Sequence, residues 1–395
     1  MRKVLILGGG FAGVEAAIML RKYNFDVTLV SNRDYFYIYP ISIWIPTGEK
    51  SFNDVSISLK KLQEIHKFEL IIDEVISIKS LEKTVYCKNH QFKYEYLVVA
   101  IGSDKMKHKG LENTVSICGK PEDSLLIKEK IDELIKKGSG SISMGFGGNP
   151  KDASNVRGGP AYELLFNIHN KLKKLGIRDK FKLNFFAPMK KPGSRMGPKA
   201  LKMMDFYFKK LNIDSFTGKK INRFEKDSIV FEDKSVLKSD FTMFIPAGTG
   251  HKVFENSDLP LNATGLVNIN NYCEVKHDYY DSPNDEYKVF AIGDCAALQG
   301  ADWRAKQGHI AEIMAKIVAF NINSIEKKKV GRKGYSCHLN ILCIMDSGNG
   351  ASFVYRDDTK AIMFPMPVFG HWLKKSWGWY CKNSKLKNIP RIPGL

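Results

Sequence analysis

An α/β fold with two parallel sheets is predicted by the length of the chain, its glycines and the order of its apolar runs. The chain has 395 residues, 44% of them apolar, which suits two or three domains. Short apolar strand-like runs alternate with runs of helical period. A glycine-rich turn directly follows the first apolar run. We therefore expect two Rossmann-like domains of the FAD/NAD(P) type, followed by a C-terminal amphipathic, membrane-facing segment.

The first element is a strand that leads into a glycine turn and a helix. Residues 4–7 are four consecutive aliphatic residues, and the helical run 14–22 comes after the turn. The first glycine permits the turn, the second lets the backbone approach a pyrophosphate, and the third lets the helix pack on the strand. We expect a dinucleotide here, and the alternative is a glycine-rich turn that only packs tightly. The expected contacts are Gly8, Gly10, Phe11, Ala12 and Gly13.

The second strand, residues 26–30, ends where a ribose is usually bound. An acidic residue commonly stands about twenty positions after the glycine turn. Here Ser31 and Asn32 occupy that place, and Asp34 comes slightly late, so nothing specific favours NAD. The aromatic stretch 35–40, which ends in Pro40, follows. It either lines a flat cofactor or belongs to the core.

Two later strands end in glycine and point to FAD. Residues 94–101 are apolar apart from Glu95, include Ala100 and lead to Gly102. Residues 287–292 repeat this form and lead to Gly293 and Asp294. A strand, a glycine and an aspartate before a helix are the arrangement by which flavoproteins bind a ribityl hydroxyl and the flavin ring. With the first glycine turn, these elements favour FAD over NAD.

A second α/β unit lies between these elements, and its glycine segment is degenerate. Residues 145–150 contain three glycines but end in Pro150, and the polar segment 151–159 delays the next helix, which we expect at 161–175. Because the helix N-terminus is displaced, we do not expect NADH to bind. The other expected elements are helices 121–137 and 198–211, strands 141–144, 182–186 and 241–246, and a hairpin over 222–237.

The rest of the chain sets the domain division. We expect a helix over 304–321, a charged linker over 326–333 and a strand over 338–345. The predicted domains are an FAD-binding domain (1–105 and 262–325), a second Rossmann-like domain (106–261) and a C-terminal redox-cysteine and membrane or quinone region (326–395).

Composition excludes several classes of protein. The net charge of +19 comes mostly from lysines scattered over the chain, and no nucleic-acid motif accompanies them. Seven dispersed cysteines without a C-x-x-C pair argue against a disulfide framework and a structural zinc site, and we expect no metal. No apolar run is long enough to span a bilayer, and the N-terminus enters a strand at once. We therefore expect a cytoplasmic protein that associates peripherally with the membrane.

Several motifs together resemble a known family. Besides the FAD elements and the degenerate second unit, these are Arg-Gly-Gly-Pro-Ala-Tyr-Glu at 157–163, Cys-Ile-Met-Asp at 343–346 and His-Trp-Leu-Lys-Lys at 371–375. Over nearly its whole length the chain resembles sulfide:quinone oxidoreductases, relatives of type II NADH dehydrogenases and of the flavin subunit of flavocytochrome c sulfide dehydrogenase. The resemblance implies that paired cysteines oxidise sulfide beside FAD, and that two electrons pass to a membrane quinone.

Four residues carry the family's site onto this chain, with one departure. Cys343 matches the C-terminal redox cysteine, and Cys118 matches a third cysteine that many members have near the flavin, sometimes bonded to it. Lys306 lies where members carry a Lys-Thr-Gly motif at the flavin. The partner of Cys343 would fall at Arg157. Since two thiols hold a bridging sulfur chain in the family, the standard route of sulfide oxidation is in question.

Three interpretations of Cys343 remain open. It is a nucleophile or persulfide carrier, with Cys118 as resolving thiol or flavin neighbour and with Arg157 or Lys306 favouring the thiolate. Alternatively it is an inert core residue, or it has a metal or other role.

The C-terminal segment has aromatic residues at helical spacing, with lysines between them. They are Phe369, Trp372, Leu373, Trp377 and Tyr380, with Lys374, Lys375 and Lys382. Aromatic residues prefer the bilayer interface and lysines meet anionic headgroups, so we expect a helix that lies on a membrane. The alternatives are a cover over the protein's own core and a contact in a homo-oligomer. A quinone channel would be lined by Phe364, Phe369 and Trp372.

The predicted function is therefore FAD-dependent electron transfer from sulfide, or another reduced sulfur donor, to a membrane quinone. One alternative is a type II NADH:quinone oxidoreductase, against which the broken segment 145–150 argues. The other is a degenerate flavoprotein that does not oxidise sulfide because Arg157 replaces a cysteine.

Overall fold

A parallel five-stranded sheet forms the first half of the fold. The computed structural model describes residues 2–275 and 288–392. The strand order is β20-β9-β1-β2-β5, and every neighbouring pair is parallel. The strands are Val289–Ala291, Tyr96–Val99, Lys3–Leu7, Asp26–Ser31 and Glu69–Ile72. This sheet confirms the predicted order of strand, glycine turn and helix, because α1 (Phe11–Lys22) begins directly after the turn.

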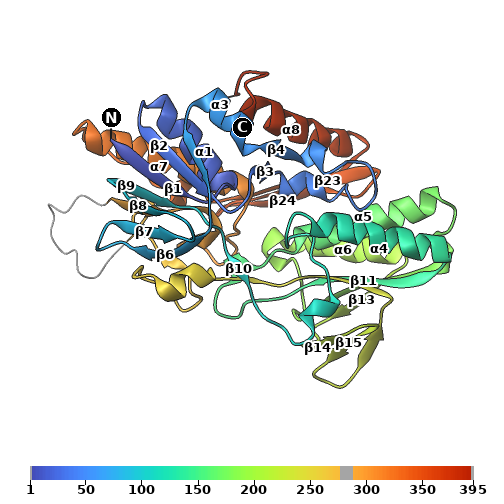
Figure 1. Ribbon diagram of the computed structural model, residues 1–395. Coiled ribbons are helices and arrows are strands. Elements are labelled where there is room, and N and C mark those ends of the chain that lie inside the picture. Colours follow the sequence, from blue (N-terminus) through green and yellow to red (C-terminus); the bar gives the residue numbers. More distant parts are fainter. Residues whose placement is uncertain (1, 276–287, 393–395) are drawn as a thin grey trace.

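Helices α1 and α7 (Gly308–Glu326) pack against each other beside this sheet (Figure 1). Smaller elements surround them. These are β3 (Tyr35–Tyr37), α2 (Tyr39–Ser42), β4 (Ser56–Ser58), α3 (Leu59–His66), and the antiparallel strands β6 (Val75–Lys79), β7 (Thr84–Cys87) and β8 (Gln91–Lys93).

The second half contains a parallel four-stranded sheet in the order β13-β12-β11-β17. Its strands are Ile213–Thr217, Phe181–Ala187, Gly140–Phe146 and Phe241–Ile245. The helices α4 (Asp123–Lys137), α5 (Gly159–Lys174) and α6 (Pro198–Lys210) lie together on one side of it, and the strands β14 to β16 lie on the other (Figure 1). Those three strands are antiparallel, as the hairpin prediction requires, and span Ile221–Glu225, Ser228–Phe231 and Val236–Lys238.

The C-terminal segment forms an antiparallel sheet and a helix. The strands β22 (Ile341–Asp346), β23 (Gly350–Arg356) and β24 (Ala361–Pro367) precede α8 (Phe369–Lys385). In the described part of the chain, none of the helices has the length and apolar character needed to cross a membrane.

Buried ion pairs fasten α8 to the first half of the fold. Glu15 of α1 is fully buried and accepts two hydrogen bonds from Arg391, at 2.8 and 2.6 Å. The buried Lys385 ammonium lies 3.3 Å from Glu15 and 2.6 Å from Glu312 of α7. Lys385 and Arg391 lower the pKa of Glu15 to about 2, although burial acts in the opposite direction. These contacts attach the C-terminal helix to both α1 and α7.

Several predicted boundaries differ from the structure. Helix α7 begins at residue 308 instead of 304, and residues 304–307 form a loop that the helical pattern did not reveal. Helix α5 begins two residues earlier than predicted, at 159, with Pro160 in its first turn, where a missing N–H costs no helical bond. Tyr287, the predicted start of a strand, lies outside the described residues.

Candidate functional site

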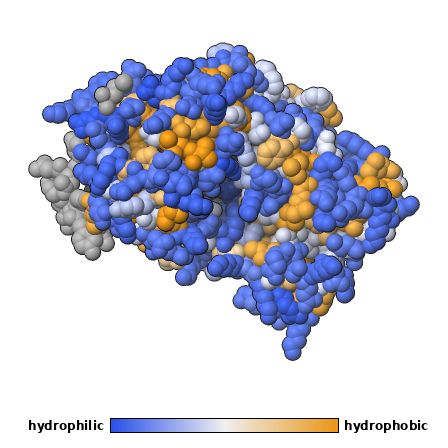
Figure 2. Space-filling model, viewed as in Figure 1, coloured by the Kyte–Doolittle hydropathy of each residue, from blue (hydrophilic) through white to orange (hydrophobic). Residues whose placement is uncertain are grey.

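A cavity of about 3170 Å³ runs between the two halves and the C-terminal segment. Its lining reaches from the glycine turn at 8–12 to Arg157, Cys118 and Cys343, and on to Leu373 and Trp377 of α8. Figure 2 shows a recess near the middle of the molecule, with hydrophobic surface gathered beside it. The candidate residues from distant parts of the sequence therefore line one continuous space.

The glycine turn forms an open cradle at one end of the cavity. A Cβ on Gly8 would lie 2.3 Å from the carbonyl oxygen of Ala100, and one on Gly13 would lie 1.8 Å from that of Gly8, so both positions require glycine. A Cβ on Gly10 would meet nothing within 4 Å, and this residue precedes α1 without a side-chain cap. The free N–H groups of the first turn of α1 can therefore bind a diphosphate, and the cradle fits FAD.

Most of the predicted cofactor residues line the cavity. They are Gly8, Gly10, Phe11, Ala12, Asn32, Pro40, Ala100, Gly102, Gly293, Asp294 and Lys306. Gly13 packs behind the turn. Ser31 differs from the prediction, because its hydroxyl is used within its own turn, donating to the carbonyl of Arg33 at 2.7 Å. Arg33 lines the cavity instead.

The aromatic stretch 35–40 divides between the wall of the cavity and the core. Tyr35, Tyr37 and Tyr39 line the cavity, whereas Phe36 and Ile38 are fully buried. Over residues 35–37 the alternation follows from β3, in which successive side chains point to opposite faces.

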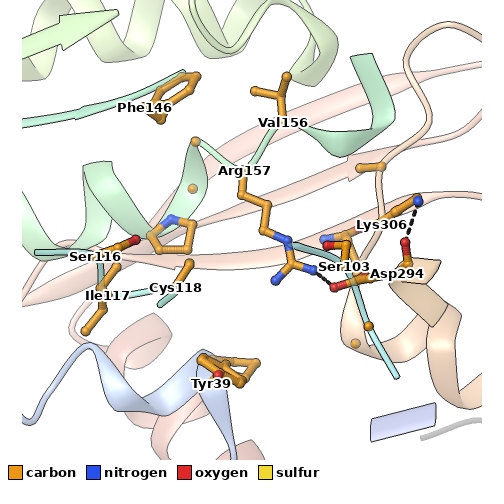
Figure 3. A pocket seen from close by; sticks show the side chains of 18 of the residues that line it. Tyr39, Ser103, Ser116, Ile117, Cys118, Phe146, Val156, Arg157, Asp294 and Lys306 are labelled. Atoms are coloured by element: carbon orange, nitrogen blue, oxygen red, sulfur yellow. Dashed lines mark hydrogen bonds and ion pairs between the residues drawn. The ribbon is translucent and has the colours of Figure 1, made fainter. Parts of the chain in front are cut away.

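Asp294 lies at the centre of a group of cations. Its carboxylate pairs with the guanidinium of Arg157, and its backbone carbonyl accepts a hydrogen bond from Lys306 Nζ at 2.7 Å (Figure 3). Burial lowers the pKa of Lys306 to about 7, with Arg157 and Arg304 acting in the same direction. Arg157 thus faces the FAD side of the cavity from the position where a redox cysteine was expected.

Cys118 lies next to Arg157 in the wall of the cavity (Figure 3). Burial raises the pKa of this thiol, while Arg157 and Lys105 act to lower it. Only 9% of the Cys118 surface is exposed. The cation that was expected to favour a thiolate at Cys343 therefore acts on Cys118.

Cys343 has a different environment on β22. Burial raises the pKa of its thiol to about 12, the Glu163 carboxylate adds to this rise, and Lys374 opposes it. Neither Arg157 nor Lys306 is among the charges that act on Cys343, so that part of the sequence prediction was wrong. Both cysteines are free thiols, and no disulfide joins them.

A buried ion pair borders the cavity beside Cys343. The Lys374 ammonium pairs with Glu163 Oε1, which also accepts a hydrogen bond from the backbone N–H of Asp346 at 2.8 Å. Burial raises the pKa of Glu163, although Lys374 opposes this effect. Lys374 was expected at lipid headgroups, but it points inward and bonds to α5.

A second charged chain leads from this pair to the surface. Asp346 Oδ2 lies 2.6 Å from His371 Nδ1, and His371 Nε2 lies 3.5 Å from Glu49, which pairs with Lys375 at 2.8 Å. Hydrogen bonds to Asp346 and Glu49 raise the pKa of His371 to about 9. Lys382 donates to the backbone carbonyl of Asn53 at 2.6 Å. The lysines between the aromatic residues therefore serve internal contacts.

The aromatic residues of α8 fall on two faces. Phe369, Trp372 and Trp379 are 66%, 62% and 60% exposed, and Phe364 of β24 is also exposed. Trp377 is half-buried, packs on the core and lines the cavity. Phe364, Phe369 and Trp372, the predicted lining of a quinone channel, do not line the cavity. The α8 residues that do line the cavity are Leu373, Lys374, Ser376, Trp377, Trp379 and Tyr380.

Sequence reasoning missed several residues of the site. Glu163 was visible only as part of the 157–163 motif, and Lys374 only as one of two adjacent lysines. The helical period places Lys374, but not Lys375, on the buried face of the helix, because Lys374 is four residues after the buried Gly370 and four before the buried Gly378. No sequence signal pointed to Lys105, which β10 (Asp104–Lys105) brings to the cavity.

The fold and the site define an α/β flavoprotein oxidoreductase. The chain belongs to the pyridine nucleotide-disulphide oxidoreductase family, whose model matches residues 2–315. The expected cofactor, FAD, is therefore confirmed, as is the expectation that the protein is an enzyme.

Comparison with individual proteins supports the predicted resemblance. The chain is 27% identical to the sulfide-quinone reductase of Aquifex aeolicus over 408 residues, covering 96% of this chain and 90% of that protein. The crystal structure of the Aquifex aeolicus sulfide:quinone oxidoreductase matches with a TM-score of 0.85 at 25% identity, covering 100% of this chain and 93% of the other. A type II NADH:quinone oxidoreductase of Staphylococcus epidermidis is 21% identical, covering 90% of each chain. The resemblance to sulfide:quinone oxidoreductases is thus confirmed.

Proposed function

We propose that this protein transfers two electrons from sulfide, or a related reduced sulfur compound, to a membrane quinone by way of FAD. The observation that carries this proposal is that Cys118 and Cys343 line the same cavity as the FAD cradle. The similarity to a sulfide-quinone reductase over 96% of the chain supports it. In this proposal residues 1–105 and 262–325 bind FAD, 106–261 form the degenerate second domain, and 326–395 supply Cys343 and the quinone side.

Cys343 is the proposed acceptor of sulfur. Hydrosulfide and the Cys343 thiol combine to a persulfide, and an S–S bond forms as two protons and two electrons leave. When bound, FAD supplies the two-electron chemistry that links this oxidation to the reduction of quinone. Because the pKa of Cys343 is raised, its proton must be removed as the bond forms, and Glu163 is the carboxylate whose charge acts on this thiol.

Glu163 and Lys374 are the proposed proton carriers of the site. Reduction of a quinone consumes protons, and this buried pair joins α5 to α8 in the wall of the cavity that Cys343 also lines. Glu163 and Lys374 hold a proton between Oε1 and Nζ without exposing it to bulk water. Leu373, Trp377 and Trp379 give the adjacent wall the apolar character that suits a quinone ring.

We propose further that the exposed face of α8 lies on a membrane. A group of exposed aromatic side chains lies near the cavity wall that α8 forms: Phe364, Phe369, Trp372 and Trp379. Since lysines of α8 are engaged internally, the apolar contact carries the binding, and headgroup attraction comes from the general positive charge of the chain.

The electron donor is tested by anaerobic mixing with sulfide, polysulfide, small thiols or NADH, followed by a soluble quinone. We expect sulfide to bleach the flavin absorbance and quinone to restore it. Bleaching by NADH instead of sulfide would identify a type II NADH:quinone oxidoreductase. Here α5 begins thirteen residues after β11 ends (146 to 159), whereas α1 begins four residues after β1 ends (7 to 11), which argues against this outcome. If no donor bleaches the flavin, the protein is a degenerate member that does not oxidise sulfide.

A further inference from the structure

Lys105 is a cation in the cavity wall, and in the described part of the chain no carboxylate lies within ion-pair distance of its ammonium, although the charge of its sequence neighbour Asp104 raises its pKa. Burial lowers the pKa of Lys105 to about 8, and the nearby charge of Arg157 lowers it further. Like-charged side chains disfavour each other's ionisation unless an anion lies between or beside them. Lys105 and Arg157 also act on the same thiol, that of Cys118. Two cations from different elements therefore converge on one cysteine.

Arg195 is a third cation in the cavity wall, and its charge and that of Arg157 act on each other. Arg195 donates to the backbone carbonyls of Ala153, at 2.8 Å, and of Val156, the residue before Arg157. Burial and Arg157 lower the pKa of Arg195 to about 10. Arg195 thus fixes the segment that carries Arg157 and adds a further cation to it. The carboxylate that pairs with Arg157 is Asp294, and it belongs to the FAD side of the site.

The chemistry of a single cysteine explains what these cations could hold. A sulfur chain that is bridged between two cysteines carries no charge, whereas a chain attached to one cysteine, or a free hydrosulfide, ends in a negatively charged sulfur. Arg157 stands where the second cysteine was expected, and it places a cation beside Cys118. Charge-assisted hydrogen bonds from guanidinium and ammonium groups are the strong ones available to such an anion.

We propose that Arg157 and Lys105 form a binding site for a small sulfur anion beside Cys118. This inference rests on the proposed function and deepens it, because it gives the form in which the donor or product is held: as an anion, by charge, rather than as a chain between two thiols. Arg157 and Lys105 would contact the anion directly, and Arg195 is a positioning residue for Arg157.

Binding of thiosulfate to the FAD-loaded protein tests this site by calorimetry, because thiosulfate ends in a charged sulfur. We expect Arg157→Gln and Lys105→Gln each to weaken binding about tenfold, the effect of one charge-assisted hydrogen bond. Lys220→Gln is the matched control. Lys220 also lines the cavity, but it is largely exposed and faces Glu232 at 3.9 Å, so its loss should leave binding within about twofold.

The outcomes separate this site from the proposed function. Equal binding by wild type, Arg157→Gln and Lys105→Gln, or equal loss in Lys220→Gln, would overturn the anion site. Bleaching of the flavin by sulfide is measured on the same samples. If thiosulfate binds in the expected pattern but sulfide never bleaches the flavin, the anion site stands and the proposed donor falls. If sulfide bleaches the flavin but the two variants bind thiosulfate as wild type does, the proposed donor stands and the anion site falls.

Discussion

The attachment of α8 should depend on one buried carboxylate. Glu15→Gln removes the charge that Arg391 and Lys385 share, and leaves the buried Lys385 ammonium with Glu312 alone. Removing one partner of a buried ion pair costs about 3–5 kcal/mol of stability. Because Glu312 still pairs with Lys385, we expect a loss at the lower end, about 3 kcal/mol. Glu312→Gln is the matched control, because Glu312 is partly exposed and Lys385 keeps Glu15. We expect about 1 kcal/mol from it.

Hydrogen exchange of the α8 amides measures this attachment locally, without requiring two-state unfolding of the whole chain. A loss of about 3 kcal/mol corresponds to roughly hundredfold faster exchange in residues 369–385. The sign of the pH dependence follows from the depressed pKa of Glu15. Its contribution is present above the unfolded value of 4.5 and is lost as the pH falls through about 2. Equal exchange in Glu15→Gln and wild type, or equal effects of the two variants, would refute the reasoning.

Two further predictions concern α8. The pKa of His371 is raised to about 9, so the stabilisation that protonated His371 provides is present below pH 6.5 and is lost as the pH rises through 9. The loss is at most roughly 3 kcal/mol. His371→Gln should therefore flatten the dependence of the unfolding free energy on pH over this window, and an unchanged curve would contradict the prediction. Trp372→Ala and Trp379→Ala should each weaken binding to anionic lipid vesicles roughly tenfold in co-sedimentation, because each removes a large exposed aromatic surface. Phe206→Ala is the control, since Phe206 is 57% exposed but lies on α6 and not on α8; an equal effect there would count against an α8 membrane face.

The sequence predicted what short-range patterns encode. The glycine turn, the parallel strands and the order of the two units follow from glycine requirements and apolar runs, and they predicted FAD because that cofactor is bound by backbone at strand ends. The resemblance to the family likewise depended on local motifs such as 157–163.

The electrostatics of the thiols could not be predicted, because they depend on residues brought together from four parts of the chain. The sequence suggested that Arg157 acts on Cys343, but the fold directs Arg157 to Cys118 and Asp294. The sequence predicted that α8 is a helix, but not which of its residues face the interior of the protein. Lys374 is buried because it meets Glu163 of α5, a contact between residues separated by 211 positions.

The central claim is that a cysteine thiol carries electrons from sulfide toward the flavin, and Cys343→Ser tests it most directly. In anaerobic stopped-flow mixing with sulfide, the variant should keep its FAD and lose sulfide-dependent bleaching. Cys337→Ser is the control, because Cys337 is exposed and does not line the cavity, and it should bleach like wild type. Undiminished bleaching in Cys343→Ser would contradict the thiol mechanism.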